Sequence, residues 1–221
     1  RMTKPKIFIA CDTTNLMKVK KIINQSKKNK IKIGYKFGLE FMNSKNGRNF
    51  ISSLKNKIIF VDLKLNDTVN TMLSTVKALK DLKIHYLTVH ISSGLTALKA
   101  VKKVSGSTKI IGVTTLTSLN NKDLKLIGYN KSVKNLVTHQ AKLAKKAALD
   151  ALVCSPYEVQ AVRKIFKKEI ITPGVQIGKK NYDQKRSMEA KQVNSDWLVI
   201  GRAITQGNIK KNIKKLIQEL K

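Results

Sequence analysis

Acidic and basic side chains alternate in one short segment, residues 60–71, whose sequence is FVDLKLNDTVNT. Asp62 and Lys64 are two residues apart, and side chains with this spacing on a strand point to the same face. Asp67 follows three residues later, where a loop can bring it towards a neighbouring site. Opposite charges at short range favour the ionised form of each group, so a lysine held in this way is a positioned proton donor. The segment indicates either proton transfer to an anionic substrate or a structural Asp62–Lys64 ion pair.

Eight short apolar runs rich in Ile and Val predict strands that would position this segment. The runs are residues 7–12, 30–35, 58–63, 86–91, 109–116, 151–155, 169–174 and 197–202. The stretches between them have helical spacing of apolar residues. Alternating strands and helices predict parallel strands joined by right-handed crossovers, and continuous hydrophobicity is typical of strands buried on both faces. Residues 1–221 are therefore predicted to form a single-domain α/β protein, a (β/α)8 TIM barrel, with a doubly wound sheet as the alternative.

The predicted barrel indicates where functional residues should lie. Active sites of such barrels lie at the carboxyl ends of the strands, and phosphate is often bound after strands 7 and 8. Asp12 and Asp62 fall at this rim, although the chain has only 13 acidic residues. Lys32, from the second predicted strand, is expected to approach the same pocket. Gly201 and Arg202 end the eighth strand and open a helix, so they offer backbone N–H groups and a guanidinium to a phosphate dianion.

The net charge of the chain is strongly positive, at +32, from 45 basic and 13 acidic residues. Such an excess raises the possibility of nucleic-acid or membrane-surface binding. Only five basic residues are arginines, however, the lysines are spread along the whole chain, and aromatic residues make up 5%. Specific nucleic-acid sites favour arginine for bidentate contacts and aromatic rings for stacking. We interpret the lysines as a solvated surface that binds polyanions weakly, and we expect no specific nucleic-acid partner.

The cysteines and the apolar runs indicate a cellular compartment. Cys11 and Cys154 each lie inside an apolar run, which argues against a disulfide framework or a zinc site and is typical of a reducing cytosol. No apolar run approaches the ~18–20 residues that a membrane span needs, and no signal-peptide segment is recognised. We expect a cytoplasmic protein without a membrane partner.

Several motifs in a fixed order make the chain similar to a known family. They are IACD, IKIG, DLKLNDTVNT, VHISSG, GVTTLTS, VCSPYE, ITPG, DQKR and VIGRAIT. Together they resemble bacterial-type orotidine 5′-phosphate decarboxylases, and the resemblance covers nearly the whole chain. The Asp-x-Lys-x-x-Asp pattern alone is only moderately specific, but the ordered set is strong.

The resemblance implies removal of the C6 carboxylate of orotidine 5′-phosphate, giving uridine 5′-phosphate and CO2 without a metal or an organic cofactor. It implies that Asp62 crowds the departing carboxylate and that Lys64 delivers a proton to C6. Lys32 would complete a Lys-Asp-Lys-Asp charge network and contact the ribose. Asp67 would enter the pocket of a partner subunit, so the resemblance also implies a homodimer.

Further substrate contacts are implied in the same way. Asp12 matches a residue that hydrogen-bonds the ribose, Thr71 lies in a segment that lines the substrate, and Thr117 matches a residue of the pyrimidine-binding loop. Gln184 matches a glutamine that closes over the phosphate, from a loop at residues 175–186 that is expected to be mobile.

The chain departs from the family pattern in two places. The usual loop begins TPGIR, whereas residues 172–176 read TPGVQ, so Gln176 replaces an arginine and is expected to be a weaker substrate contact. Many bacterial members read DLKxHDIPNT, whereas Asn66, Thr68 and Val69 stand here. These changes affect the expected substrate affinity and loop rigidity more than the reaction.

Three alternatives remain open from the sequence. A sister group of metal-dependent sugar-phosphate decarboxylases and hexulose-phosphate synthases carries an acid on the second strand that helps to bind Mg2+, whereas Lys32 would repel a cation. A lysine-rich nucleic-acid-binding barrel would bind polyanions tightly with a steep salt dependence. A catalytically silent scaffold is disfavoured by the presence of Lys32, Asp62, Lys64 and Asp67 together.

Overall fold

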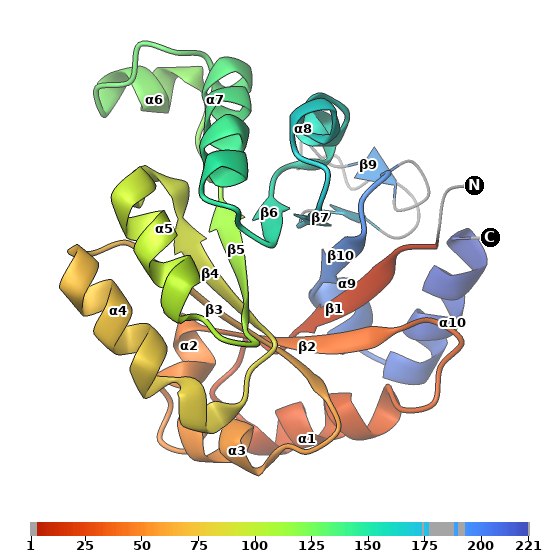
Figure 1. The fold of residues 1–221 in the computed structure, drawn as a ribbon. Helices are drawn as coiled ribbons and strands as arrows, with labels where there is room; N and C mark the ends of the chain where they lie inside the picture. The colour runs from red at the N-terminus through yellow and green to blue at the C-terminus, as the bar shows by residue number, and fades with distance from the viewer. Residues whose placement is uncertain (1–3, 174, 177–187, 190–192, 221) are drawn as a thin grey trace.

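The computed structural model describes residues 4–173, 175–176, 188–189 and 193–220, and in this part of the chain eight parallel strands close into a barrel (Figure 1). Their order around the barrel is β1-β10-β7-β6-β5-β4-β3-β2. The strands are β1 (Lys6–Ala10), β2 (Ile33–Gly38), β3 (Ile58–Leu65), β4 (Tyr86–His90), β5 (Lys109–Val113), β6 (Ala151–Val153), β7 (Glu169–Thr172) and β10 (Trp197–Ile200). Two short strands, β8 (Val175–Gln176) and β9 (Met188–Glu189), pair separately. The barrel prediction is confirmed, and the doubly wound alternative is wrong.

Helices between the strands form an outer layer around the barrel (Figure 1). They are α1 (Leu16–Gln25), α2 (Leu39–Met42), α3 (Gly47–Ser53), α4 (Val69–Ala78), α5 (Leu95–Val104), α6 (Asn121–Leu126), α7 (Val133–Lys146), α8 (Val159–Ile165), α9 (Arg202–Thr205) and α10 (Ile209–Glu219). Three helices have a side-chain N-cap: Asn15 caps α1, Ser132 caps α7 and Asn208 caps α10. Each capping side chain accepts a hydrogen bond from a backbone N–H of the first turn. Among the described residues, no helix combines the length and the apolar character that crossing a membrane requires.

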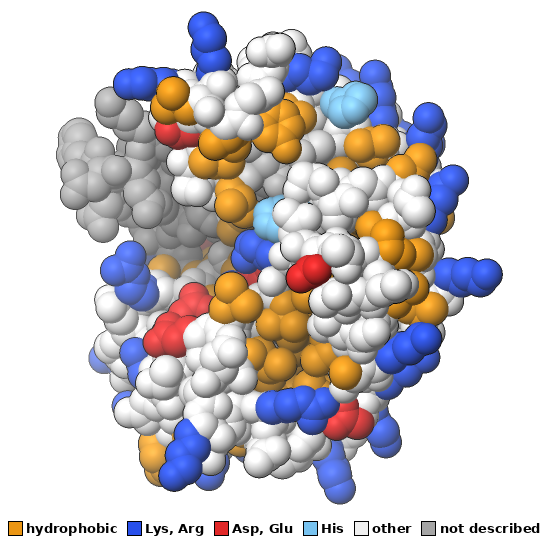
Figure 2. All heavy atoms as spheres, turned by 90° about the vertical axis from the view of Figure 1, so that its left-hand side faces the viewer, with side chains coloured by type: hydrophobic (Ala, Val, Ile, Leu, Met, Phe, Trp, Pro, Cys, Tyr) orange, Lys and Arg blue, Asp and Glu red, His pale blue; other side chains and the backbone are white. Residues whose placement is uncertain are grey.

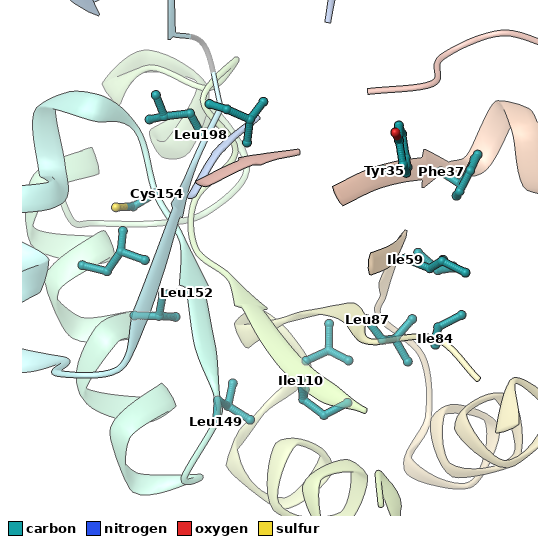
Figure 3. Packing of buried hydrophobic residues seen from close by; sticks show 14 of the residues in the cluster. Tyr35, Phe37, Ile59, Ile84, Leu87, Ile110, Leu149, Leu152, Cys154 and Leu198 are labelled. Carbon is teal, nitrogen blue, oxygen red and sulfur yellow. The ribbon is translucent and has the colours of Figure 1, made fainter. Parts of the chain in front are cut away.

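Buried side chains form two separate layers. The larger layer lies between the strands and the helices, and Figure 3 shows members of it, such as Phe37, Leu87 and Leu152. The smaller layer contains strand residues only: Phe8, Phe60, Tyr86, Ile111, Ala151, Ile171 and Trp197. Because successive strand residues point to opposite faces, this second layer fills the inside of the barrel. The barrel is therefore a packed core rather than a channel, and it leaves only its ends for chemistry.

Aromatic rings fill the inside of the barrel at its amino-terminal end. Phe8 stacks on Trp197 with ring centroids 3.9 Å apart. A Cβ at Gly34 would lie 2.6 Å from Cε1 of Phe8, so only glycine leaves room for this ring on the neighbouring strand. Stacked and edge-to-face rings add to the stabilisation from their buried area.

One carboxylate closes this end of the barrel. Glu169, the first residue of β7, accepts hydrogen bonds from Lys6, Lys109, Tyr86 and Trp197, at donor–acceptor distances of 2.7–2.9 Å. Each of these four donors is the first residue of its own strand. Burial opposes ionisation of Glu169, but the donors outweigh it and lower the pKa of this carboxyl to about 2. Glu169 thus fastens five strands together at the end of the barrel opposite the expected active site.

The second strand does not lie where the sequence predicted it. The predicted run was residues 30–35, whereas β2 is Ile33–Gly38, three residues further along the chain. The apolar pattern misplaced it because lysines alternate with apolar residues both before the real strand, at Lys30 and Lys32, and within it, at Lys36. The other seven predicted strands start at, or one residue after, the first residue of the observed strands.

Candidate active site

A pocket of about 170 Å3 lies at the carboxyl ends of the barrel strands. Its lining comes from β2, β3, β5, β6 and β10, and from the segments that follow β5, β6 and β7. The polar lining residues are Lys36, Asp62, Lys64, Thr115 and Thr117, and the remaining ones are mostly apolar. An apolar pocket with a few convergent polar groups is the usual form of a small-molecule site.

Asp62 is the central charged group of this pocket. Its side chain is 7% exposed. Oδ2 receives hydrogen bonds from Nζ of Lys64 at 2.8 Å and from Nζ of Lys36 at 3.1 Å, and Oδ1 receives one from Oγ1 of Thr88 at 2.8 Å. Burial alone would raise the pKa of Asp62, but Lys36, Lys64 and Thr88 lower it below its ordinary value. The site therefore holds a buried carboxylate in its ionised form.

Lys64 has an unusual backbone conformation. Its φ angle is +47°, in the left-handed region that residues with a side chain seldom adopt. The register between β3 and β4 shifts between Val61 and Leu65, so Lys64 lies in a bulge. The predicted proximity of Asp62 and Lys64 is confirmed, but a bulge produces it rather than the regular alternation of a strand. Backbone conformations of this kind concentrate at functional sites, because the surrounding structure has to hold them.

The expectation for Lys32 is wrong. Lys32 is exposed and precedes β2, and its backbone carbonyl accepts the N–H of Ile7 near the start of β1. It therefore lies at the amino-terminal end of the barrel, and its expected contacts with the charge network and the ribose cannot form there. Lys36, four residues later, points into the pocket and occupies the position that the sequence assigned to Lys32. The error follows directly from the misplaced second strand.

Asp12 extends the charge network towards solvent. It follows β1, its side chain is 60% exposed, and its Oδ1 lies 3.9 Å from Nζ of Lys36. Charges therefore alternate across the pocket in the order Asp12, Lys36, Asp62 and Lys64. Within one chain the network therefore consists of Asp12, Lys36, Asp62 and Lys64, with Lys36 in the place expected for Lys32.

Asp67 and Thr71 lie outside this pocket. Both are exposed, Asp67 in the loop after β3 and Thr71 in the first turn of α4. Oδ1 of Asp67 accepts the backbone N–H of Thr68, and Oγ1 of Thr68 donates a hydrogen bond to Oγ1 of Thr71. Among the described residues, Asp67 forms no ion pair with the lysines of the pocket.

The remaining predicted residues fall into two groups. Thr117 lines the pocket, while Gly201 and the exposed Arg202 form the start of α9 at the carboxyl end of β10. Gln176 belongs to β8, of which only the backbone is described. Gln184 lies outside the described residues, as does most of the predicted loop at 175–186.

Sequence analysis missed three polar residues of the site, which are Lys36, Thr88 and Thr115. Lys36 could have been found from its neighbours, because Tyr35 and Phe37 alternate with it and are buried. Thr88 is fully buried and lies two residues after Tyr86, which faces the inside of the barrel. A hydroxyl inside an otherwise apolar strand is the available signal, but its partners cannot be read from the sequence.

The site contains few candidate metal ligands. Within the described ranges, no group of three or more His, Cys, Asp or Glu side chains is arranged to hold a metal ion. His90, at the end of β4, is half-buried, and desolvation together with the nearby Lys64 lowers its pKa.

A closed parallel barrel with a charged pocket at the carboxyl ends of its strands defines a TIM-barrel enzyme. Residues 5–215 match the orotidine 5′-phosphate decarboxylase / HUMPS family. The chain belongs to this family.

Relatives named orotidine 5′-phosphate decarboxylase resemble the chain over nearly its whole length. The one from Wolbachia sp. subsp. Brugia malayi (strain TRS) is 40% identical over 220 residues, which cover 96% of each chain. The one from Buchnera aphidicola subsp. Acyrthosiphon pisum (strain Tuc7) is 38% identical over 224 residues, covering 96% of this chain and 93% of the relative.

Solved structures give the same result. The crystal structure of orotidine 5′-phosphate decarboxylase from Lactobacillus acidophilus has a TM-score of 0.82 at 28% identity and covers 99% of both chains. Orotidine 5′-monophosphate decarboxylase from Methanocaldococcus jannaschii, solved with the inhibitor BMP, has a TM-score of 0.80 at 24% identity and covers 99% of both chains. At 24% identity, the similarity to the Methanocaldococcus jannaschii structure shows a shared fold only.

Proposed function

We propose that this chain is a carboxy-lyase that converts orotidine 5′-phosphate to uridine 5′-phosphate and CO2 in de novo pyrimidine biosynthesis. Family membership and the names of its relatives support this reaction. The observation that carries the proposal is the buried Asp62 carboxylate held between the Lys36 and Lys64 ammonium groups. This arrangement places a fixed negative charge, which can destabilise a bound carboxylate, beside a proton donor, which can protonate a carbanion.

The chemistry follows from these charges. The C6 carboxylate of the substrate, placed against Asp62, is repelled in the ground state. When the C6–carboxylate bond breaks, CO2 leaves as a neutral molecule and the electron pair stays on C6. The Lys64 ammonium stabilises this carbanion and then transfers a proton from Nζ to C6. The repulsion is relieved and the new attraction forms only as CO2 departs, so both favour the transition state over the bound substrate.

The rest of the substrate supplies binding energy for this strain. We assign the ribose to Lys36 and Asp12, which lie together at the mouth of the pocket, and the pyrimidine to Thr117 on its wall. We assign the phosphate dianion to Arg202 and the backbone of Gly201. Gln176 and Gln184 stay candidates for the same end of the substrate, from the loop at 175–186. Binding energy from groups distant from the reacting carbon can compensate for crowding at that carbon.

We propose a homodimer in which Asp67 and Thr71 complete the pocket of the partner subunit. Both side chains are exposed and lie outside the pocket lining of their own chain, which fits a role in a second copy. A two-fold dimer would place this segment of each protomer against the other pocket, so each subunit would depend on its partner.

The remaining proposals concern cofactors, location and other partners. The mechanism above needs no metal or organic cofactor, because Lys64 supplies the proton and the substrate supplies the electron pair. Both cysteines are free and buried, which fits a cytoplasmic enzyme. Figure 2 shows the Lys and Arg side chains of one face distributed over the surface rather than gathered in one patch. This distribution supports a solvated surface without a specific nucleic-acid partner.

A sugar-phosphate reaction of the sister group is the second candidate, because the family includes it. The acid that those enzymes use on the second strand to bind Mg2+ is replaced here by a lysine. The correction from Lys32 to Lys36 leaves this argument intact, because Lys36 also repels a cation.

The deciding experiment follows the ultraviolet absorbance of orotidine 5′-phosphate mixed with the purified protein in excess EDTA. We expect the orotate band to disappear with the wild-type protein and to persist with Lys64→Ala. Turnover of a sugar phosphate with Mg2+, in place of this result, would assign the chain to the sister group. Absence of both activities, together with tight salt-dependent binding to polyanions, would overturn the enzyme proposal.

A further inference from the structure

Thr88 connects the two central groups of the site through one oxygen atom. Its Oγ1 donates a hydrogen bond to Oδ1 of Asp62 at 2.8 Å and accepts the backbone N–H of Lys64 at 2.9 Å. Thr88 is fully buried in the middle of β4. It is absent from the pocket lining, so its hydroxyl acts behind Asp62 rather than on the substrate.

The bulge in β3 makes the second of these hydrogen bonds necessary. Regular pairing of β3 with β4 stops at Val61 and resumes at Leu65, so Lys64 lies outside the regular ladder. A buried N–H without an acceptor is costly, and a left-handed lysine is strained by itself. The hydroxyl of Thr88 takes the place of the missing ladder acceptor. It therefore stabilises the conformation that directs the Lys64 ammonium back onto Asp62.

The first hydrogen bond fixes the carboxylate. Lys36 and Lys64 both bind Oδ2, which leaves Oδ1 to Thr88. With both oxygens engaged, the Asp62 carboxylate cannot rotate away from the position where it faces the substrate. A hydroxyl has one hydrogen to donate and lone pairs to accept, so a single threonine can satisfy both partners.

We propose that Thr88 is a positioning residue for decarboxylation, which holds the Asp62 carboxylate and the left-handed Lys64 in register through its hydroxyl group. This inference rests on the proposed function of the site, because it concerns the same two groups. It gives Thr88, on β4, a role in positioning the reacting groups of β3.

The test compares Thr88→Val, which keeps the shape but loses the hydroxyl, with Thr88→Ser, which keeps the hydroxyl. The matched control is Thr108→Val. Thr108 precedes β5, at the opposite end of the barrel, and its Oγ1 donates a hydrogen bond to the carbonyl of Ile84. Three quantities are measured on each protein: kcat and KM with orotidine 5′-phosphate, affinity for uridine 5′-phosphate, and hydrogen exchange of the Lys64 amide. Thr88→Ala replaces the valine variant if that variant does not fold.

We expect Thr88→Val to lower kcat by about tenfold to a hundredfold, with product affinity within about threefold of wild type, because small displacements of reacting groups are costly. Thr88→Ser should keep kcat within about threefold of wild type, as should Thr108→Val. The Lys64 amide should exchange faster in Thr88→Val only.

Other results would overturn the inference. An unchanged kcat in Thr88→Val, or an equal loss in Thr88→Ser, would show that the hydroxyl does not position the site. A loss of product affinity as large as the loss of kcat would indicate a general packing role. Absence of decarboxylation in the wild-type protein would instead refute the proposed function, and the exchange rate of the Lys64 amide would still test the hydrogen bond.

Discussion

The ammonium groups of Lys36 and Lys64 bind the same oxygen atom, Oδ2 of Asp62, at 3.1 Å and 2.8 Å. Two like charges are brought together because the carboxylate lies between them, and each lysine therefore depends on Asp62 for its place. The two lysines come from adjacent strands, β2 and β3. The two lysines differ in their other contacts. Lys64 lies in the bulge of β3, whereas Lys36 also forms an ion pair with Asp12.

Replacement of Lys36 should therefore affect turnover, whereas replacement of Lys32 should not. We expect Lys36→Ala to lower kcat/KM by at least about a hundredfold, because it removes one of the two charges that hold Asp62 in place. Lys32→Ala is the matched control, since the exposed Lys32 lies at the other end of the barrel. The two rates are measured by loss of orotate absorbance. Equal effects of the two substitutions would contradict the position assigned to Lys36.

The pH dependence of turnover should reveal the same ion pairs. The pKa of Asp62 is lowered, so Asp62 stays ionised as the pH falls through the ordinary range of an aspartate. Lys36→Ala should raise this pKa because it removes an adjacent positive charge, so the acid limb of kcat should move to higher pH. Lys64, His90 and Asp12 also face this region. An acid limb that stays in place would show that Lys36 does not govern the ionisation of Asp62.

Mixing two inactive variants should restore activity if Asp67 acts in the partner subunit. In a mixed dimer of Asp67→Ala and Lys64→Ala protomers, one pocket would carry both defects and the other would carry none. Random exchange of subunits should then recover about a quarter of the wild-type activity. The measurement is turnover after the two variants are mixed and allowed to exchange. Recovery would be absent if Asp67 served its own subunit or if the protein were a monomer.

Removal of Arg202 should weaken substrate binding more than it slows chemistry at saturation. A guanidinium–phosphate contact is charge-assisted and bidentate, so Arg202→Ala should raise KM by about tenfold to a hundredfold. Lys214→Ala provides a control, because Lys214 is an exposed cation on α10. A similar KM for both variants would assign the phosphate to another part of the rim.

Glu169 should control stability rather than catalysis. Because its pKa in the folded protein is lowered from 4.5 to about 2, its contribution is fully present above about pH 4.5 and is lost as the pH falls towards 2. We expect Glu169→Gln to lower the free energy of unfolding at neutral pH by about 1–2 kcal/mol, a value reduced for solvent screening.

The measurement for Glu169 is chemical denaturation at several pH values, with Glu40→Gln, an exposed residue of α2, as the control. The difference between the wild-type protein and Glu169→Gln should shrink as the solution is acidified. A difference that does not depend on pH would mean that the lost contribution is not ionic.

Local patterns were sufficient to predict the barrel and half of the charge network. Short Ile- and Val-rich runs separated by helical spacing predict alternating strands and helices, which pack either as a parallel barrel or as a doubly wound sheet, and the eight runs favour the barrel. Asp62 and Lys64 could be paired because they are two residues apart in the sequence, although a bulge rather than regular alternation brings their side chains together. These predictions depend on neighbours in the sequence, for which periodicity is informative.

Tertiary structure decided which residues from other strands join that pair. Strand β2 starts three residues later than its apolar pattern predicted. Lys36 therefore lies near the carboxyl end of the strand and reaches Asp62, whereas Lys32 precedes the strand. Thr88 meets Lys64 because a bulge in β3 frees one backbone N–H. Strand boundaries, bulges and the register between strands depend on contacts between residues far apart in the chain. A single sequence contains the residues of this site, but only the closed barrel brings them to one carboxylate.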